Sequence, residues 1–84
     1  MTILRVFDTV LEARKEAEYA YWLCIDKGYK IKYHAVHPYK IEYGLDSYIY
    51  MVNRSEYCLG LRVNKIEDYT RSGVCDEIRA CQYP

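Results

Sequence analysis

Two histidines, four cysteines and a group of lysines are the residues of this 84-residue chain that could carry chemistry. His34 and His37 lie three residues apart, and Cys58 is a further side chain that could join them as a metal ligand. Zinc needs three or four ligands that converge at about 2.0–2.3 Å, and the chain has no Cys-x-x-Cys pair. We therefore expect no metal site and no cofactor, and we interpret the histidines as surface residues of a basic strand.

The sequence contains no motif of a catalytic site. Nucleophilic catalysis needs a nucleophile beside an oriented base, and no motif pairs one of the cysteines with a histidine. The four glycines stand singly, so there is no phosphate-binding loop. Solvated faces explain the acidic side chains Glu16, Glu18, Glu67 and Asp68 better than paired catalytic carboxylates do. We predict no catalytic residue and no enzyme activity.

The four cysteines, Cys24, Cys58, Cys75 and Cys81, could form two disulfides in three alternative ways. Residues 1–8 lack the basic and apolar pattern of a signal peptide. The longest apolar run, residues 19–25, is too short to span a bilayer. We therefore expect a soluble, cytoplasmic protein in which the thiols stay free and buried.

Charge is balanced overall but unevenly distributed. The chain has 12 Lys and Arg against 12 Asp and Glu, which argues against a dedicated double-stranded DNA binder. Residues 27–41 contain four lysines, two histidines and no acid. Basic residues interleaved with aromatic ones can follow a phosphate backbone and stack on bases, and the candidates for single-stranded nucleic acid are Lys30, Lys32, His34, His37, Tyr39 and Lys40. The alternative interpretation is an edge strand that its lysines protect from aggregation.

One long helix is the clearest predicted element. Residues 2–7 are predicted as a short strand, and the helix follows from about Val10 to Lys27. Thr9 and Glu12 have the spacing of a capping box. Apolar residues recur at helical spacing and mark a buried stripe, which consists of Val10, Ala13, Ala17, Ala20, Tyr21 and Cys24.

From Tyr29 the apolar pattern changes to a period of two, which predicts an antiparallel meander of three to four strands. Its last two strands are expected at residues 48–52 and 57–66. Two-residue hairpin loops would place Tyr43 opposite Tyr48 and Ile41 opposite Tyr50. One face then carries the residues expected to pack under the helix: Tyr39, Ile41, Tyr43, Tyr48, Tyr50, Val52, Tyr57, Leu59, Leu61 and Val63.

The opposite face of the meander includes Ile49, Met51, Cys58 and Arg62. A short C-terminal helix with an apolar stripe of Val74, Ile78 and Cys81 is expected to follow. If this helix leaves Ile49 and Met51 uncovered, a partner or a second copy would be needed to cover them.

Together these patterns predict one α+β domain over residues 1–84. The expected function is that of a small non-enzymatic protein-interaction module, an inhibitor or regulator of a target protein, a class that includes phage proteins directed at host or defence enzymes. The candidate protein-binding residues are Ile49, Met51, Arg62, Tyr48 and Tyr50. Two alternatives stay open: single-stranded nucleic-acid binding through the basic strand, and a homodimeric structural subunit.

Overall fold

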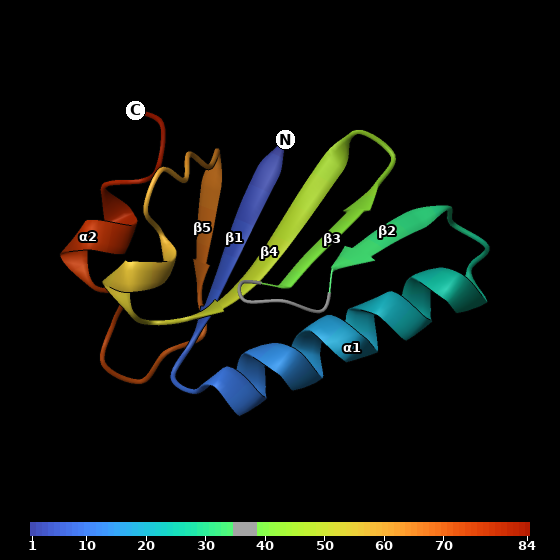
Figure 1. Cartoon of the computed structure of the whole chain (residues 1–84), viewed down its shortest axis with the longest axis horizontal. Helices are drawn as coiled ribbons and strands as arrows, with labels where there is room; N and C mark the ends of the chain where they lie inside the picture. The colour runs from blue at the N-terminus through green and yellow to red at the C-terminus, as the bar shows by residue number, and fades with distance from the viewer. Residues whose placement is uncertain (35–38) are drawn as a thin grey trace.

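The structure, a computed structural model, describes residues 1–34 and 39–84, and it describes residues 32–34 by their backbone alone (Figure 1). Two helices, one 3₁₀ helix and five strands follow one another along the described chain. In order they are β1 (Thr2–Phe7), α1 (Val10–Asp26), β2 (Ile31–His34), β3 (Tyr39–Tyr43), β4 (Asp46–Val52), η1 (Ser55–Tyr57), β5 (Lys65–Asp68) and α2 (Asp76–Arg79). The predicted α+β class, the long helix and the short C-terminal helix are confirmed.

The five strands form one mixed sheet in the order β2-β3-β4-β1-β5. Only β2, β3 and β4 form the predicted antiparallel meander, whereas β1 lies between β4 and β5 and runs parallel to both. The prediction of a purely antiparallel sheet is therefore wrong. The physical reason lies in β1, whose Ile3, Leu4, Val6 and Phe7 are buried on both faces. A nearly continuous apolar run of this kind is typical of a central parallel strand.

The predicted strand at residues 57–66 is also wrong. The chain instead leaves β4 through η1 and passes a turn at Gly60, whose φ of +78° favours glycine. It then forms β5 from Lys65 on the far side of β1. As a result Tyr57, Leu61 and Val63 pack in the cluster on the face away from α1, and Leu59 is exposed.

The β3–β4 hairpin differs from the predicted register by two residues. Tyr43 pairs with Asp46, and Ile41 pairs with Tyr48, because the loop is Gly44-Leu45. A shift of two residues leaves every side chain on its face, whereas a shift of one would have reversed them. The prediction that the tyrosines of β3 and β4 pack under the long helix is therefore confirmed.

Small residues let α1 lie close to the sheet. The Thr9 hydroxyl accepts a hydrogen bond from Glu12 N at 3.1 Å and begins the helix. Ala13 and Ala17 are fully buried against Tyr39, Ile41 and Tyr50, their neighbours in one cluster. Figure 1 shows α1 running along one side of the sheet from β1 to the edge strand β2.

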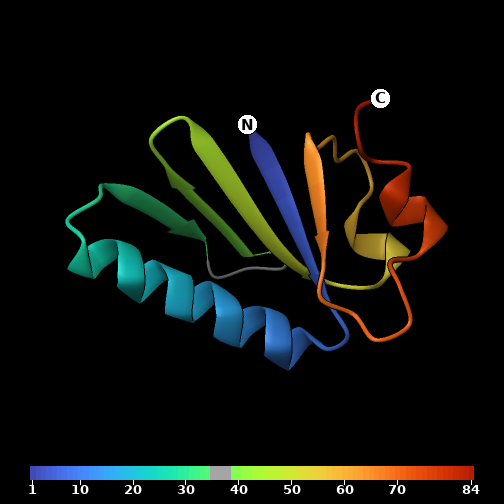
Figure 2. The same cartoon turned by 180° about the vertical axis from the view of Figure 1, so that it is seen from behind.

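The other face of the sheet has a separate core. Leu4, Val6, Ile49 and Met51 form its floor, and the predicted stripe of the C-terminal helix packs on them: Val74, Ile78 and Cys81. Figure 2 shows α2 and the segment around η1 together at the β5 end of the sheet, away from α1. Two cores thus lie on opposite faces of one sheet.

Candidate interaction surface

Three of the five predicted protein-binding residues, Ile49, Met51 and Tyr50, are buried. Met51 is 1 % exposed, and Ile49 lies with it under α2. Tyr50 is buried on the other face under α1. The sequence left open whether the C-terminal helix covers this face, and the structure shows that it does. These three residues belong to the cores.

The other two predicted protein-binding residues remain accessible to different degrees. Tyr48 is half-buried beside the α1 core, stacks on Tyr43 at 5.3 Å between ring centroids and lies under the Arg5 guanidinium at 4.8 Å. Arg62 is exposed, and its Nη1 donates a hydrogen bond to Leu61 O. The two lie on different parts of the fold, so the structure does not bring the five predicted residues together at one surface.

The residues predicted to bind nucleic acid are only partly described. Tyr39 is 7 % exposed and packs in the α1 core, so its ring cannot stack on a base. Lys40 is bound to Glu42 at 3.0 Å, and Lys30 is exposed next to the edge strand β2. Lys32 and His34 belong to β2, where only their backbone is described. His37 lies outside the described residues.

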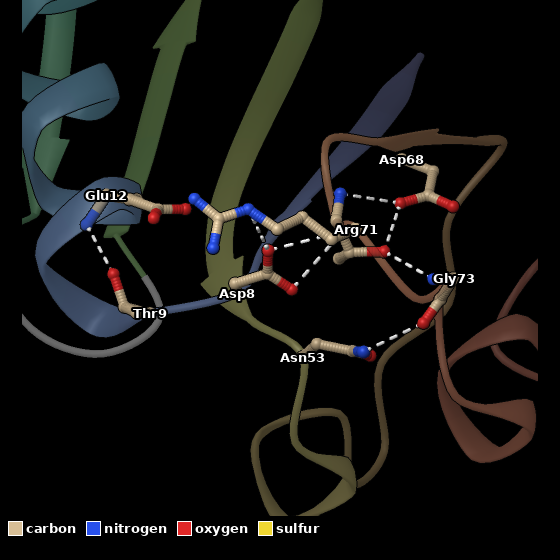
Figure 3. A network of polar contacts seen from close by, with 8 residues as sticks. Asp8, Thr9, Glu12, Asn53, Asp68, Arg71 and Gly73 are labelled. Atoms are coloured by element: carbon tan, nitrogen blue, oxygen red, sulfur yellow. Dashed lines mark hydrogen bonds and ion pairs between the residues drawn. The ribbon is translucent and has the colours of Figure 1, made fainter.

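Polar side chains gather where the three parallel strands end (Figure 3). Asp8 follows β1, and its carboxylate accepts a hydrogen bond from Arg71 N at 3.2 Å. Asn53 follows β4 and binds the backbone of Gly73 and Cys75, each at 2.9 Å. Asp68 ends β5 and accepts hydrogen bonds from Thr70 N and Oγ1, which hold the pKa of this carboxyl below its ordinary value.

Ligands often bind at the carboxyl ends of parallel strands, but here these side chains hold a loop of the chain itself. The side chains of Asp8, Asn53 and Asp68 each form a hydrogen bond with a residue of the segment 70–75, as Figure 3 shows. Asp68 also pairs with Arg79 of α2 at 3.6 Å. The network fastens the loop that leads into α2, and we assign it a structural role.

The cysteines are free thiols, three of them buried. Cys58 donates to Ser55 O at 3.0 Å, and Cys81 donates to Cys58 O at 3.5 Å. Burial and the hydrogen bond with Cys81 raise the pKa of Cys58 to about 11. Because the thiolate is the nucleophile, Cys58 is a poor nucleophile at neutral pH and acts as a packing residue.

The solvent side of α1 carries an unusual set of exposed side chains, which we call the α1 ridge. Its members are large and apolar: Leu11, Tyr19, Trp22, Leu23 and Ile25. Tyr19 and Trp22 are 67 % and 62 % exposed. Scattered single apolar residues are normal on a surface, and five large ones on the outer side of one helix make it a candidate contact surface.

A groove runs along one flank of this ridge, and we call it the α1 groove. It has a volume of about 200 Å³ and lies between α1, β1 and the residue that follows β5. Its lining combines aromatic rings with one guanidinium and one carboxylate: Phe7, Tyr19, Tyr50, Tyr69, Ala20, Leu23, Arg5 and Glu16. The groove is smaller than typical small-molecule pockets of about 300–1,000 Å³, so it fits a side chain better than a metabolite.

Arg5 sets the electrostatics of the groove. Its Nε donates to Glu67 at 2.7 Å, and its Nη1 donates to the Tyr50 hydroxyl at 2.8 Å. Burial works to lower the pKa of Arg5, but Glu67 and Tyr50 outweigh it and raise that pKa. Burial likewise works to raise the pKa of Glu67, yet the hydrogen bonds and charges of Arg5 and Lys65 hold it below its ordinary value. Arg5 is therefore a fixed cation with a bound counter-charge.

The ridge was not predicted, because the prediction for this helix concerned only its buried stripe. Trp22 comes nine residues after the buried Ala13, which is two and a half turns at 3.6 residues per turn. It must therefore point away from the sheet, and this signal was present in the sequence. The groove was not predictable, since it depends on β5 lying beside β1.

Among the described residues, no helix is both long and apolar enough to cross a bilayer. Within residues 1–34 and 39–84, no three His, Cys, Asp or Glu side chains are grouped so that they could hold a metal ion. A comparison with protein-family models, curated proteins and solved structures finds no match to this chain.

Proposed function

We propose that this chain is a non-enzymatic protein-interaction module that binds another polypeptide through the α1 ridge and the α1 groove. The observation that carries the proposal is the exposure of five large apolar side chains on a helix whose other side is already packed. Trp and Tyr are the residues most often found to dominate binding energy at interfaces. A module of this kind acts by occupying its target, so we propose an inhibitor or regulator of a target protein.

The chemistry of the groove favours an aromatic side chain of the partner. The Arg5 guanidinium already lies over the rings of Tyr48 and Tyr50, at 4.8 and 5.5 Å from their centroids. A guanidinium attracts the face of a further ring and repels a cation. The Glu16 carboxylate, which also lines the groove, would repel an anion and could accept a hydrogen bond from an N–H or O–H group.

A photo-crosslinking residue at position 19, within the ridge, tests this function. We expect it to link the chain to one polypeptide in cells, and we expect the complex rebuilt from the two purified chains to weaken about tenfold or more on Trp22→Ala. The matched control is Leu45, which is 97 % exposed in the β3–β4 loop. The crosslinker placed there should give no such adduct, and Leu45→Ala should leave affinity unchanged.

Two results would contradict the proposal. Equal weakening by Trp22→Ala and Leu45→Ala would show that the ridge has no special role. An adduct that disappears on nuclease treatment, with binding that falls steeply as salt rises, would point instead to nucleic acid.

A further inference from the structure

We propose that Cys58 and Cys81 form a redox-active dithiol, which small-molecule disulfides oxidise to an intramolecular disulfide. In the reduced chain both thiols pack in the core under α2, on the face of the sheet away from α1. The site is separate from the α1 ridge and the α1 groove, and it does not depend on the proposed function.

The two sulfur atoms lie beside one another because they share a hydrogen-bond acceptor. Cys58 Sγ lies 3.7 Å from Glu77 O, and Cys81 Sγ lies 3.5 Å from the same oxygen. Cys81 Sγ is also 3.5 Å from Cys58 O, the carbonyl of the other cysteine. The two thiols hydrogen-bond to each other as well. Each sulfur is therefore within reach of the other.

The backbone around the pair leaves room for the sulfurs to approach. Cys58 is the residue after η1, and Cys81 comes two residues after the end of α2. Neither cysteine belongs to one of the five strands. A small shift at either residue can bring the sulfurs together while the pairing of the strands stays intact.

A groove beside α2 gives a small molecule access to both thiols, and we call it the α2 groove. Its volume is about 750 Å³, which lies within the range of about 300–1,000 Å³ for small-molecule sites. Both cysteines line it, together with the exposed Leu59 and Arg62. The Arg62 guanidinium offers a charge partner for a disulfide that carries carboxylates, such as oxidised glutathione.

Cys81 is the thiol that starts the reaction. Burial and the hydrogen bond with Cys81 raise the pKa of Cys58 to about 11, and the attacking species is a thiolate, so Cys58 is the slower nucleophile. Cys81 loses its proton to water, and its Sγ attacks one sulfur of the small disulfide. The S–S bond of the small molecule breaks, one thiolate leaves, and Cys81 keeps the other half as a mixed disulfide.

The mixed disulfide makes Cys58 easier to ionise. Burial, the hydrogen bond with Cys81 and the charges of Cys81 and Cys75 raise its pKa, and both contributions of Cys81 disappear once that thiol is blocked. Cys58 Sγ then attacks Cys81 Sγ, and the second small thiolate leaves. In sum, two protein thiols are oxidised to one disulfide, and the small disulfide is reduced to two thiols.

The other two cysteines serve as internal comparisons. Cys24 is a buried residue of α1, which packs on the opposite face of the sheet. Cys75 packs against the same core as the pair, but it is not among the residues that line the α2 groove. We expect neither to take part in the disulfide.

The test incubates the folded full chain with oxidised glutathione, blocks the remaining thiols by alkylation and maps tryptic peptides by mass spectrometry. Trypsin separates the three cysteines of this face, since the peptides 55–62, 72–79 and 80–84 contain one each. We expect a link between peptides 55–62 and 80–84, a loss of two hydrogen atoms from the mass of the chain, and full reversal by dithiothreitol.

Single substitutions report the order of the two steps. Cys58→Ser should stop at the mixed disulfide, so that one glutathione stays on peptide 80–84. Cys81→Ser should react about tenfold or more slowly than the wild type. Cys75→Ser is the matched control from the same core and should form the wild-type disulfide at the wild-type rate. Far-UV circular dichroism checks that each variant is folded, and the wild-type map needs no variant.

Two results would overturn the proposal. In the first, peptides 55–62 and 80–84 stay unlinked in the folded wild type and become linked only in urea, which would show that the α2 groove does not admit the disulfide. In the second, Cys75 is linked to Cys58 or Cys81 as often as these two are linked to each other. Neither result concerns the α1 ridge, whose function is tested by the crosslink at position 19.

Discussion

The two faces of the sheet solve the same packing problem with different side chains. The face under α2 is aliphatic, with a core of Leu, Val, Ile, Met and Cys, and a four-residue helix with its adjoining loops covers it. The α2 groove, of about 750 Å³, lies beside this helix and is lined in part by Cys58, Leu59 and Cys81. The face under α1 is built mainly from tyrosines, and a 17-residue helix leaves a groove beside them. Tyrosine hydroxyls need hydrogen-bond partners or water, which favours an edge that stays open. The aliphatic core under α2 stabilises the fold, and the open edge of the tyrosine face is where we propose that the partner binds.

The α1 face is ordered by a row of planar side chains that runs across the sheet. Successive members lie near one another, with ring centroids 5.1–6.3 Å apart where two rings meet. The row consists of Tyr29, Tyr43, Tyr48, Arg5, Tyr50, Phe7 and Tyr69. Both of its end rings, Tyr29 and Tyr69, are about half exposed. The row ends at the groove, so a ring of a partner would extend an arrangement that already exists.

The largest effect is expected on the aliphatic face, from Met51→Asp. This change places a carboxylate in a core of apolar side chains, and burying an unpaired charge is among the most destabilising substitutions. We expect the free energy of unfolding to fall by about 4 kcal/mol or more, measured by urea denaturation. Leu59→Asp is the control, since Leu59 is exposed and its substitution should cost less than about 0.5 kcal/mol. A folded, stable Met51→Asp protein would mean that α2 does not close this face.

The burial of Met51 also shows which parts of the fold could be predicted from the sequence. The alternation of apolar and polar residues placed Ile49 and Met51 on one face and the tyrosines on the other, and this alternation holds in β3 and β4. The stripe of Val74, Ile78 and Cys81 predicted the C-terminal segment that covers them, although only Ile78 lies within α2. These features are local, because a period of two or of 3.6 is contained in a short stretch of chain.

The order of the strands could not be predicted in the same way. Whether β1 or a strand from residues 57–66 lies beside β4 depends on contacts between residues far apart in the chain. Arg5 and Glu67 are 62 residues apart, and their ion pair forms only because β5 lies beside β1. The α1 groove depends on the same placement, because Tyr69 in its lining follows β5, so the groove could not be predicted from local patterns.

A smaller loss is expected under α1 from Ala17→Leu. Ala17 is fully buried where the helix approaches Ile41 and Tyr50, and added methylene groups in a packed core cost about 1–3 kcal/mol. Denaturation of the variant measures this loss. Glu18→Leu on the same helix is a useful comparison, because residue 18 is largely outside the core and should tolerate the larger side chain. Equal losses for both would show that α1 packs no more closely at Ala17 than at its surface.

The Arg5–Glu67 pair should make stability depend on pH in the acidic range. The pKa of Glu67 is lower in the folded chain than its ordinary value of 4.5, so the unfolded chain takes up the proton first and stability falls as pH drops below that value. Glu67→Gln should cost about 1–2 kcal/mol at pH 7. The difference between wild type and variant should shrink steadily toward low pH. A constant difference would show that the charge of Glu67 contributes nothing.

The smallest effect is expected at alkaline pH on the α2 face. Burial and the hydrogen bond with Cys81 raise the pKa of Cys58 from 9.0 to about 11, so the unfolded chain loses this proton first. Stability then falls as pH rises above 9.0, by less than about 1 kcal/mol at pH 9.5. Cys58→Ala lacks this titration, and its stability should fall less over the same range than that of the wild type. If both curves fall in parallel, the Cys58 thiol titrates alike in the folded and unfolded chains, and the α2 face is more open to water than its packing indicates.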